Sequence, residues 1–177
     1  HEQGASGVVV AGTTGEGTLL SPADRRAVTA AAVQTSVPVI AGASGATLDD
    51  LHADVARLGG TGVEAVMVLA PSYQPLTDEE LVDVHVAVAD RSEVPTIVYH
   101  IPQFTGTTLT PEAVRALAGH RNIVGIKDSS PDHAHREGLI AAAKGRLGVF
   151  VGDGASLGAA LRSGAAGSIT AIANLRM

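Results

Sequence analysis

Lys127 directly follows an apolar segment, residues 123–126, that has the length and composition of a short buried strand. The chain contains ten arginines but only two lysines, so arginine supplies most of its basic surface charge. Burial disfavours the ammonium form of a lysine, and the neutral amine is a nucleophile toward carbonyl carbon. This stretch alone is equally compatible with a lysine that forms a Schiff base and with a strand-end lysine that reaches solvent.

Other residues with useful chemistry also follow apolar segments. Tyr99 is placed to act as a general acid/base near such a lysine, and Tyr73 is placed to extend a relay of hydroxyl groups. Thr13 and Thr14 offer hydroxyls and backbone N–H groups near a helix start, which suits a carboxylate. Each feature alone has an ordinary explanation, such as a buried tyrosine or a common turn, but their convergence on one site favours chemistry.

The elements that must position these residues alternate regularly along the chain. Apolar segments predict seven strands, at residues 7–12, 38–42, 65–70, 95–99, 123–126, 147–151 and 167–172. Helix-start signals such as Ser21-Pro22 and Thr77-x-x-Glu80 predict six helices, at residues 22–35, 47–59, from 77 onward, 110–119, 130–145 and 157–162. Residues 100–109 are predicted to form a loop.

Repeated strand–helix units predict an α/β fold with a parallel sheet, either a doubly wound open sheet or a (β/α)8 TIM barrel. Distinctive residues follow five different strands, since Gly152-Asp153-Gly154 follows a fifth apolar segment, and only a barrel brings the ends of so many strands to one mouth. We therefore predict a single barrel domain over residues 1–177. Because a (β/α)8 barrel typically needs roughly 250 residues, we expect the barrel to be incomplete in this chain.

Composition limits the function classes. The net charge of −6 argues against nucleic acid and anionic membranes as partners, and no apolar run approaches the roughly 20 residues that span a bilayer. The absence of cysteine excludes thiol catalysis and fits a cytoplasmic protein. His133 and His135 do not share a helix face, so we expect no metal site, and Schiff-base chemistry needs no cofactor.

Three segments together resemble the dihydrodipicolinate synthase/N-acetylneuraminate lyase family: Gly12-Thr13-Thr14-Gly15-Glu16, Tyr99-x-Ile101-Pro102 and Gly125-Ile126-Lys127-Asp128. The resemblance extends over nearly the whole chain, in the right order and spacing. It implies a (β/α)8 barrel followed by C-terminal helices. The chain would then contain strands 2 to 8, without the first strand and the C-terminal helices.

The resemblance also implies site roles. Lys127 would form the Schiff base with pyruvate, and Tyr99 would be the general acid/base, hydrogen-bonded through Thr13 to Tyr73. In many members the residue matching Tyr73 comes from a neighbouring subunit, which implies a homo-oligomer, a dimer or a tetramer. The substrate-binding residues would be Thr13, Thr14, Phe104, Gly152 and Ile169.

Departures from the family pattern bear on the substrate. Phe104 stands where dihydrodipicolinate synthases carry an arginine that binds the carboxylate of the aldehyde, and a phenyl ring cannot replace a guanidinium. We therefore expect a lyase or aldolase that acts on 2-keto-3-deoxy sugar acids. The alternatives are dihydrodipicolinate synthase itself and a keto-acid sensor without turnover.

Two further departures concern regulation and packing. Pro22, Arg25 and Ser72 occupy positions of the lysine feedback site found in some synthases, so we expect no inhibition by lysine. His100 replaces the usual asparagine after the catalytic tyrosine. Because strand alternation points it away from the side of Tyr99, we expect it to have a structural role.

Overall fold

The computed structural model describes residues 4–175, and its seven strands form one parallel sheet in which each strand pairs with the next along the chain. The strands are Val8–Val10 (β1), Val39–Ser44 (β2), Ala65–Leu69 (β3), Thr96–His100 (β4), Ile123–Asp128 (β5), Gly148–Val151 (β6) and Gly167–Ser168 (β7). The helices are Pro22–Val33 (α1), Leu48–Gly59 (α2), Asp78–Arg91 (α3), Pro102–Thr105 (α4), Pro111–Leu117 (α5), His133–Ala143 (α6), Leu157–Arg162 (α7) and the 3-10 helix Ala171–Asn174 (η1).

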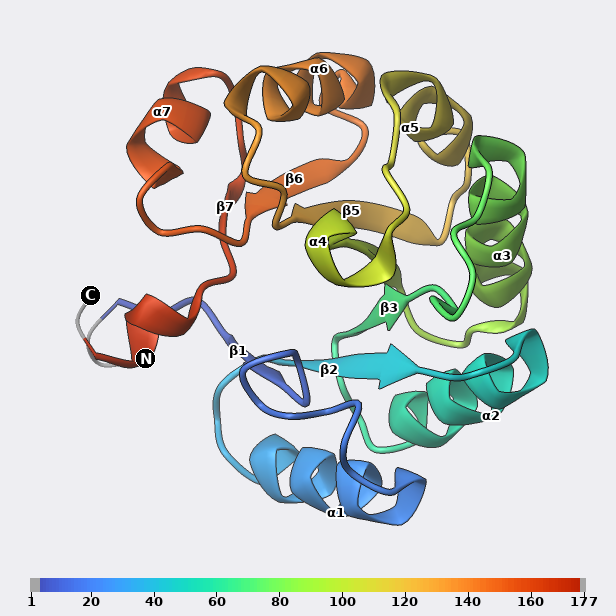
Figure 1. Cartoon of the computed structure of the whole chain (residues 1–177). Coiled ribbons are helices and arrows are strands. Elements are labelled where there is room, and N and C mark those ends of the chain that lie inside the picture. Colours follow the sequence, from blue (N-terminus) through green and yellow to red (C-terminus); the bar gives the residue numbers. More distant parts are fainter. Residues whose placement is uncertain (1–3, 176–177) are drawn as a thin grey trace.

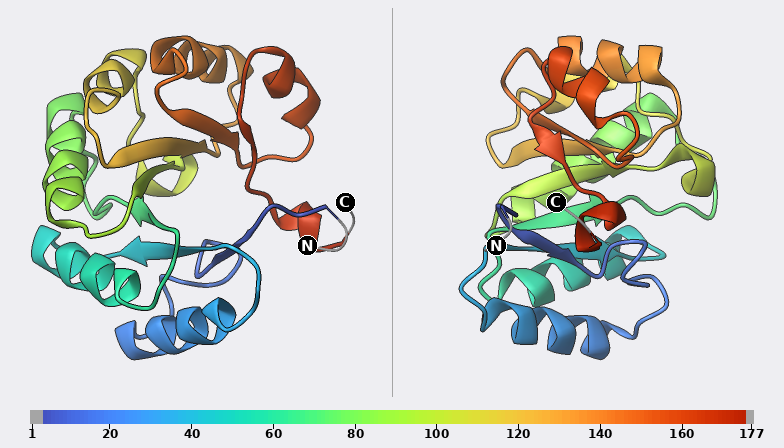
Figure 2. Two further views of the ribbon diagram at one scale, coloured as in Figure 1. Left: turned by 180° about the vertical axis from the view of Figure 1, so that it is seen from behind. Right: turned by 90° about the vertical axis from the view of Figure 1, so that its left-hand side faces the viewer.

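The sheet curls, and the larger helices lie along its outer face (Figure 1). The short helix α4 lies instead over the centre of the curl, beyond the carboxyl end of β4, and the side view in Figure 2 shows the same layering. β1 and β7 are the two edges of the sheet. The architecture is an incomplete (β/α)8 barrel, which confirms the barrel over the doubly wound alternative.

Local sequence fixes where the helices begin. Thr47 and Thr77 each close a capping box with the acidic residue three positions later, and Ser21 caps α1 directly before a proline. These caps satisfy backbone N–H groups that the first helical turn leaves free. The helix starts therefore follow the strands closely, as the sequence predicts.

Strand alternation divides the buried side chains into two layers. Residues such as Val66, Val98 and Ile126 pack outward against the helices, in two large apolar clusters. Met67 and Tyr99 instead face the inside of the curl, in a smaller cluster. This division matters for the site, because consecutive residues of one strand belong to different layers.

The structure corrects two predicted elements. The expected loop at residues 100–109 contains α4, which ends at Gly106 in the left-handed conformation (φ 67°). The expected strand at residues 167–172 ends at Ser168, because Thr170 accepts a hydrogen bond from the Ile172 N–H and caps η1. Within residues 4–175, no helix combines the length and the apolar character needed to cross a membrane.

Candidate active site

Lys127 and Tyr99 lie next to each other on the inner face of the sheet. They are register partners on β5 and β4, and the Lys127 amine nitrogen lies 4.2 Å from the centre of the Tyr99 ring. Both residues are buried, with 8% and 7% of their surface exposed. Within the described part of the chain, the Lys127 amine makes no hydrogen bond or ion pair, so its nitrogen is unoccupied by the protein. The strand-end lysine of the sequence is thus a buried group.

Thr13, in the turn after β1, contacts Tyr99 of β4. The Thr13 Oγ1 and the Tyr99 hydroxyl are 2.8 Å apart, although the residues are 86 positions apart in sequence. Either oxygen can donate in this bond, which is the property that a proton relay requires. The predicted contact between Tyr99 and Thr13 is therefore present in the structure.

The turn that carries Thr13 is held in an unusual conformation. Ala11, which precedes it, has φ 54°, in the left-handed region that residues with a side chain rarely adopt. The Ala11 carbonyl packs tightly onto two glycines: a Cβ would lie 1.9 Å from its oxygen at Gly17 and 2.2 Å at Gly42. A methyl group fits at neither position, so both glycines are required for this turn.

Arg25 of α1 ties the same turn to the body of the protein. Its buried guanidinium donates to the carbonyl oxygens of Gly17 at 2.5 Å and Leu20 at 3.2 Å, and lies 3.1 Å from the Asp54 carboxylate. Asp54 also accepts a bond from the Ser44 N–H at the end of β2. The sequence gives no sign of this role, because arginine on a helix is usually exposed.

Tyr73 does not join the site within one chain. Its side chain is 96% exposed in the segment after β3, so it does not complete the expected relay through Thr13. The segment directs it outward to solvent rather than into the barrel. Thr14 is also exposed, and in the described residues it makes no hydrogen bond. The expected relay consists of the hydroxyl groups of Tyr99, Thr13 and Tyr73, and the structure brings together the first two.

The remaining expected binding residues lie on α4 and directly after β6 and β7. Phe104 is on α4 and is 69% exposed. Gly152 follows β6 and donates its N–H to the Asp128 carbonyl at 2.7 Å, and a Cβ there would lie 2.0 Å from the Ser129 Oγ. Ile169 donates its N–H to Val151 at 2.9 Å, so this donor belongs to the sheet and is not free for a substrate.

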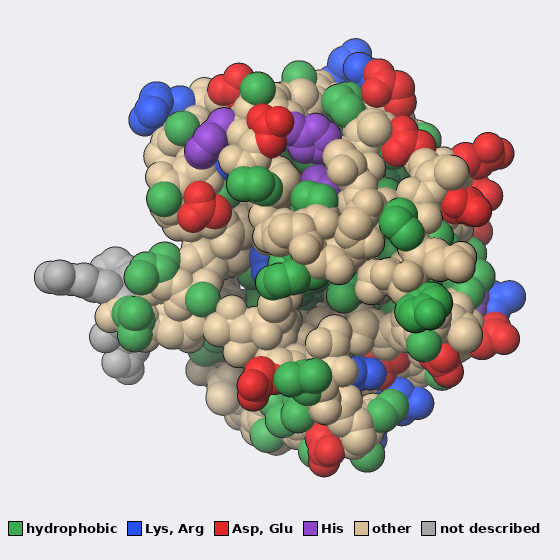
Figure 3. All heavy atoms as spheres, in the orientation of Figure 1, with side chains coloured by type: hydrophobic (Ala, Val, Ile, Leu, Met, Phe, Trp, Pro, Cys, Tyr) green, Lys and Arg blue, Asp and Glu red, His purple; other side chains and the backbone are tan. Residues whose placement is uncertain are grey.

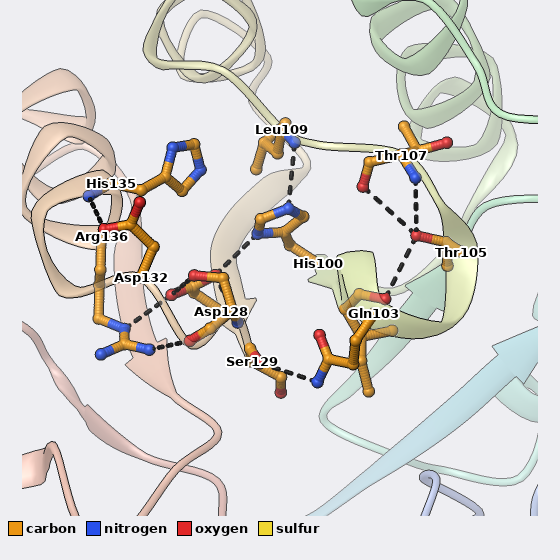
Figure 4. A network of polar contacts seen from close by, with 12 residues as sticks. His100, Gln103, Thr105, Thr107, Leu109, Asp128, Ser129, Asp132, His135 and Arg136 are labelled. Atoms are coloured by element: carbon orange, nitrogen blue, oxygen red, sulfur yellow. Dashed lines mark hydrogen bonds and ion pairs between the residues drawn. The ribbon is translucent and has the colours of Figure 1, made fainter.

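A second pair of residues lies one position beyond the first, on the opposite face of the same strands. His100 and Asp128 are register partners, and the His100 Nδ1 lies 2.7 Å from the Asp128 carboxylate (Figure 4). His100 contacts Leu109 of the outer apolar cluster, whereas Tyr99 belongs to the inner one, as strand alternation predicts. The structure therefore gives it the structural contacts that the sequence suggests.

Arg136 completes this buried network. Its Nε donates to the other Asp128 oxygen at 2.7 Å, and its remaining nitrogens donate to the Ser130 carbonyl and, at 3.0 Å, to the Ser156 hydroxyl. Burial would raise the pKa of the Asp128 carboxyl, but hydrogen bonds from His100 and the Ser130 N–H outweigh it and lower that pKa. The carboxylate is therefore ionised and paired.

The space-filling view in Figure 3 shows the face that carries the mouth. It is hollowed at its centre, hydrophobic side chains border the hollow, and histidines gather over the region of α6. Acidic side chains lie mainly around the outer part of this face. The hollow lies where the inner faces of the strands end.

His85 is a buried titratable group that the sequence does not single out. It lies on α3, is 3% exposed, and lines a small cavity with Leu81, Val98 and Thr107. Desolvation lowers the pKa of its imidazole from 6.5 to about 4. The ring makes no hydrogen bond to any residue that the structure describes, so it is neutral and unpaired at neutral pH.

Known proteins resemble this chain over nearly its whole length. The sequence model of the "Dihydrodipicolinate synthetase family" matches residues 2–176. A 4-hydroxy-tetrahydrodipicolinate synthase of Xanthomonas axonopodis is 36% identical over 97% of this chain and 58% of its own length. An uncharacterized DapA-like lyase of Halobacterium salinarum is 35% identical over 98% of this chain and 58% of its own length.

Solved structures of related proteins are also similar to this chain over nearly its whole length. The chloride-inhibited dihydrodipicolinate synthase from Acinetobacter baumannii, complexed with pyruvate, has a TM-score of 0.92 and 32% identity over 98% of this chain and 60% of its own. YagE, an E. coli K12 prophage protein of the dihydrodipicolinic acid synthase family, also in complex with pyruvate, has a TM-score of 0.91 and 28% identity over the same shares. The chain spans about three fifths of the length of these relatives. The chain therefore belongs to the dihydrodipicolinate synthetase family.

Proposed function

We propose that this protein is a class I lyase or aldolase in which Lys127 forms a Schiff base with pyruvate. One observation carries the proposal: the unoccupied Lys127 amine lies 4.2 Å from the centre of the Tyr99 ring, whose hydroxyl is bonded to Thr13. A buried amine beside a hydroxyl pair provides a nucleophile and a proton relay at one place. Pyruvate complexes of two structural relatives support the choice of keto acid.

The proposed reaction begins when the Lys127 nitrogen attacks the C2 carbonyl of pyruvate and the carbonyl oxygen leaves as water. Tyr99 supplies the proton that this departure needs, and it recovers a proton through Thr13. Loss of a proton from C3 to the Tyr99–Thr13 hydroxyl pair then gives an enamine, which attacks the aldehyde carbon of the second substrate. The aldehyde oxygen takes up that proton and becomes a hydroxyl group, and the nitrogen is again part of an iminium. Water finally hydrolyses the imine, releases the new 2-keto acid and restores the amine.

For the second substrate, we infer that the synthase reaction is the first candidate, because several relatives are named 4-hydroxy-tetrahydrodipicolinate synthase. The product in that enzyme name is 4-hydroxy-tetrahydrodipicolinate. Removing the three carbons of pyruvate from it leaves a four-carbon amino acid with an aldehyde group, aspartate 4-semialdehyde. The names of the relatives thus favour this reaction over the sugar-acid reaction expected from the sequence. Phe104 keeps the sugar-acid reaction as the second candidate, because it offers no charge for a carboxylate.

We also propose a homo-oligomer in the cytoplasm. The support for assembly is Tyr73, whose almost fully exposed ring would complete the hydroxyl relay only if a neighbouring subunit received it. A location in the cytoplasm is supported by the absence of cysteine.

The test is borohydride reduction in the presence of pyruvate, followed by mass spectrometry, on the protein produced from its complete gene. We expect a reduced pyruvyl adduct on Lys127, which Lys127→Arg abolishes. Lys144→Arg is the matched control, because Lys144 is an exposed lysine after α6 and should leave the adduct unchanged. An unmodified Lys127 would refute the Schiff base, and an adduct without turnover of either aldehyde would favour the keto-acid sensor.

A further inference from the structure

His100 connects three segments that surround the mouth. It is the last residue of β4, its Nδ1 lies 2.7 Å from Asp128 at the end of β5, and its Nε2 accepts the Leu109 N–H at 3.1 Å (Figure 4). Leu109 is fully buried and ends the segment that leads to α5. One imidazole therefore holds both ends of residues 101–109 against the neighbouring strand.

The two hydrogen bonds define the state of the ring. A backbone N–H can only donate, so the His100 Nε2 that faces Leu109 carries no proton. The ring proton is then on Nδ1, from which it is donated to the ionised Asp128 carboxylate. Arg136 holds the other oxygen of that carboxylate, so the acceptor is itself fixed in place.

The segment between these ends, residues 101–109, carries Phe104 over the mouth. Two other side chains anchor it: Gln103 donates to the Ser129 carbonyl at 3.0 Å, and the Thr107 hydroxyl accepts the Leu76 N–H at 2.9 Å. The position of Phe104 therefore depends on a few side-chain contacts, among which His100 supplies the buried one.

Lys127 and Tyr99 are held differently. They are positioned by strand pairing between β4 and β5, and strand alternation places their side chains on the opposite face from the His100 ring. A change in the His100 side chain should therefore move residues 101–109 without moving the amine and the hydroxyl. The first half of the proposed reaction uses the inner pair, whereas Phe104 bears only on the proposed binding of the aldehyde.

We propose that His100 is a positioning residue that sets the specificity for the second substrate, by fixing residues 101–109 and Phe104 against β5. This inference rests on the proposed function. An asparagine side chain also combines a donor with an acceptor, so it can replace the imidazole in contacting Asp128, whereas leucine cannot.

The test compares His100→Asn, His100→Leu and Gln103→Leu in the protein from the complete gene, with exposed Gln34→Leu after α1 as the control. The aldehydes are aspartate 4-semialdehyde and D-glyceraldehyde, the latter being what remains when pyruvate is removed from a six-carbon 2-keto-3-deoxy sugar acid. For His100→Leu we expect kcat/KM for the aldehyde that the protein uses to fall about 10- to 100-fold. The rate of pyruvate adduct formation on Lys127 should change less than about threefold, since the inner pair is kept. Gln103 is exposed, so Gln103→Leu should fold normally, and its kcat/KM for the aldehyde should also fall. His100→Asn should keep most of the kcat/KM that His100→Leu loses.

An unchanged kcat/KM for the aldehyde in both leucine variants would overturn the proposal. So would an equal loss in the rate of adduct formation on Lys127, or a kcat/KM as low in His100→Asn as in His100→Leu.

Hydrogen–deuterium exchange tests the positioning of residues 101–109 independently of any reaction. Peptides spanning residues 101–109 should exchange about tenfold faster in His100→Leu than in His100→Asn. Equal exchange would refute the positioning role, whereas a missing pyruvate adduct in the unsubstituted protein would refute the proposed function alone.

Discussion

The Lys127 amine lies 4.2 Å from the centre of the Tyr99 ring because the two residues are partners across neighbouring parallel strands. Backbone pairing, rather than a contact between flexible side chains, sets their separation. The proposed nucleophile and the tyrosine ring are thus held together before any substrate binds, which would limit the reorganisation that the proposed reaction needs.

Tyr99→Phe keeps the ring beside Lys127 and removes the hydroxyl bonded to Thr13. We expect turnover to fall about 10²- to 10⁴-fold, the usual contribution of general acid/base catalysis, with little change in stability. Steady-state kinetics checks the first result and thermal unfolding checks the second. Full turnover in this variant would remove Tyr99 from the proton-transfer role.

Phe104→Arg should change which aldehyde is preferred. A guanidinium on exposed α4 can form a charge-assisted, bidentate pair with the carboxylate of aspartate 4-semialdehyde, which D-glyceraldehyde lacks. We expect the ratio of kcat/KM values to move about tenfold or more toward the charged aldehyde. Phe104→Leu is the control, because it changes the side chain without adding charge. A constant ratio would place the aldehyde carboxylate away from α4.

Gly42→Ala should destabilise the protein, because its methyl group would lie 2.2 Å from the Ala11 carbonyl oxygen. Relief of that overlap should cost about 1–3 kcal/mol of unfolding free energy and displace the turn that carries Thr13. Gly60→Ala is the matched control, since a Cβ there meets its nearest atom at 3.5 Å. Equal midpoints in urea unfolding for both variants would contradict the tight packing of this turn.

His85 should make stability depend on pH between about 6.5 and 4. Its pKa is about 4 in the folded protein, so only the unfolded chain takes up this proton over that interval. The free energy of unfolding should therefore fall as pH falls, by roughly 3 kcal/mol over the whole interval. His85→Phe should flatten this part of the stability profile, because it removes the titrating group. Parallel profiles for the two proteins would show that His85 is not buried as described.

The sequence predicts much of this fold, for identifiable reasons. Regular strand and helix signals determine the alternation of elements, and the inner residues at the strand ends follow from it, so Lys127, Tyr99 and Thr13 are found together as expected. Elements with weak local signals are less predictable. The four-residue helix α4 looks like a loop, and the last strand is cut short by the Thr170 cap.

Other contacts between segments, away from the inner strand ends, are not predictable from sequence patterns. Arg136 meets Asp128 across 8 residues and Ser156 across 20, and nothing in the sequence near any of them shows that the arginine is buried. The exposed position of Tyr73 is similar, because the direction of a side chain in a turn depends on the turn's own conformation. Local patterns give the elements, whereas these features depend on how the elements meet.

The alternation on β4 and β5 gives this part of the chain little tolerance for insertions and deletions. Residues 125–128 pair regularly with β4, so adding one residue between Gly125 and Lys127 would turn Ile126 toward Tyr99, and removing one would turn Asp128 toward it. Either change would send the lysine into the apolar layer beneath α6. Chain length in this regularly paired part is thus constrained as strictly as side-chain identity, whereas the register shift between Thr96 and Ile97 already accommodates one extra residue of β5. Natural variation in the length of the barrel should be confined to the loops between its strands.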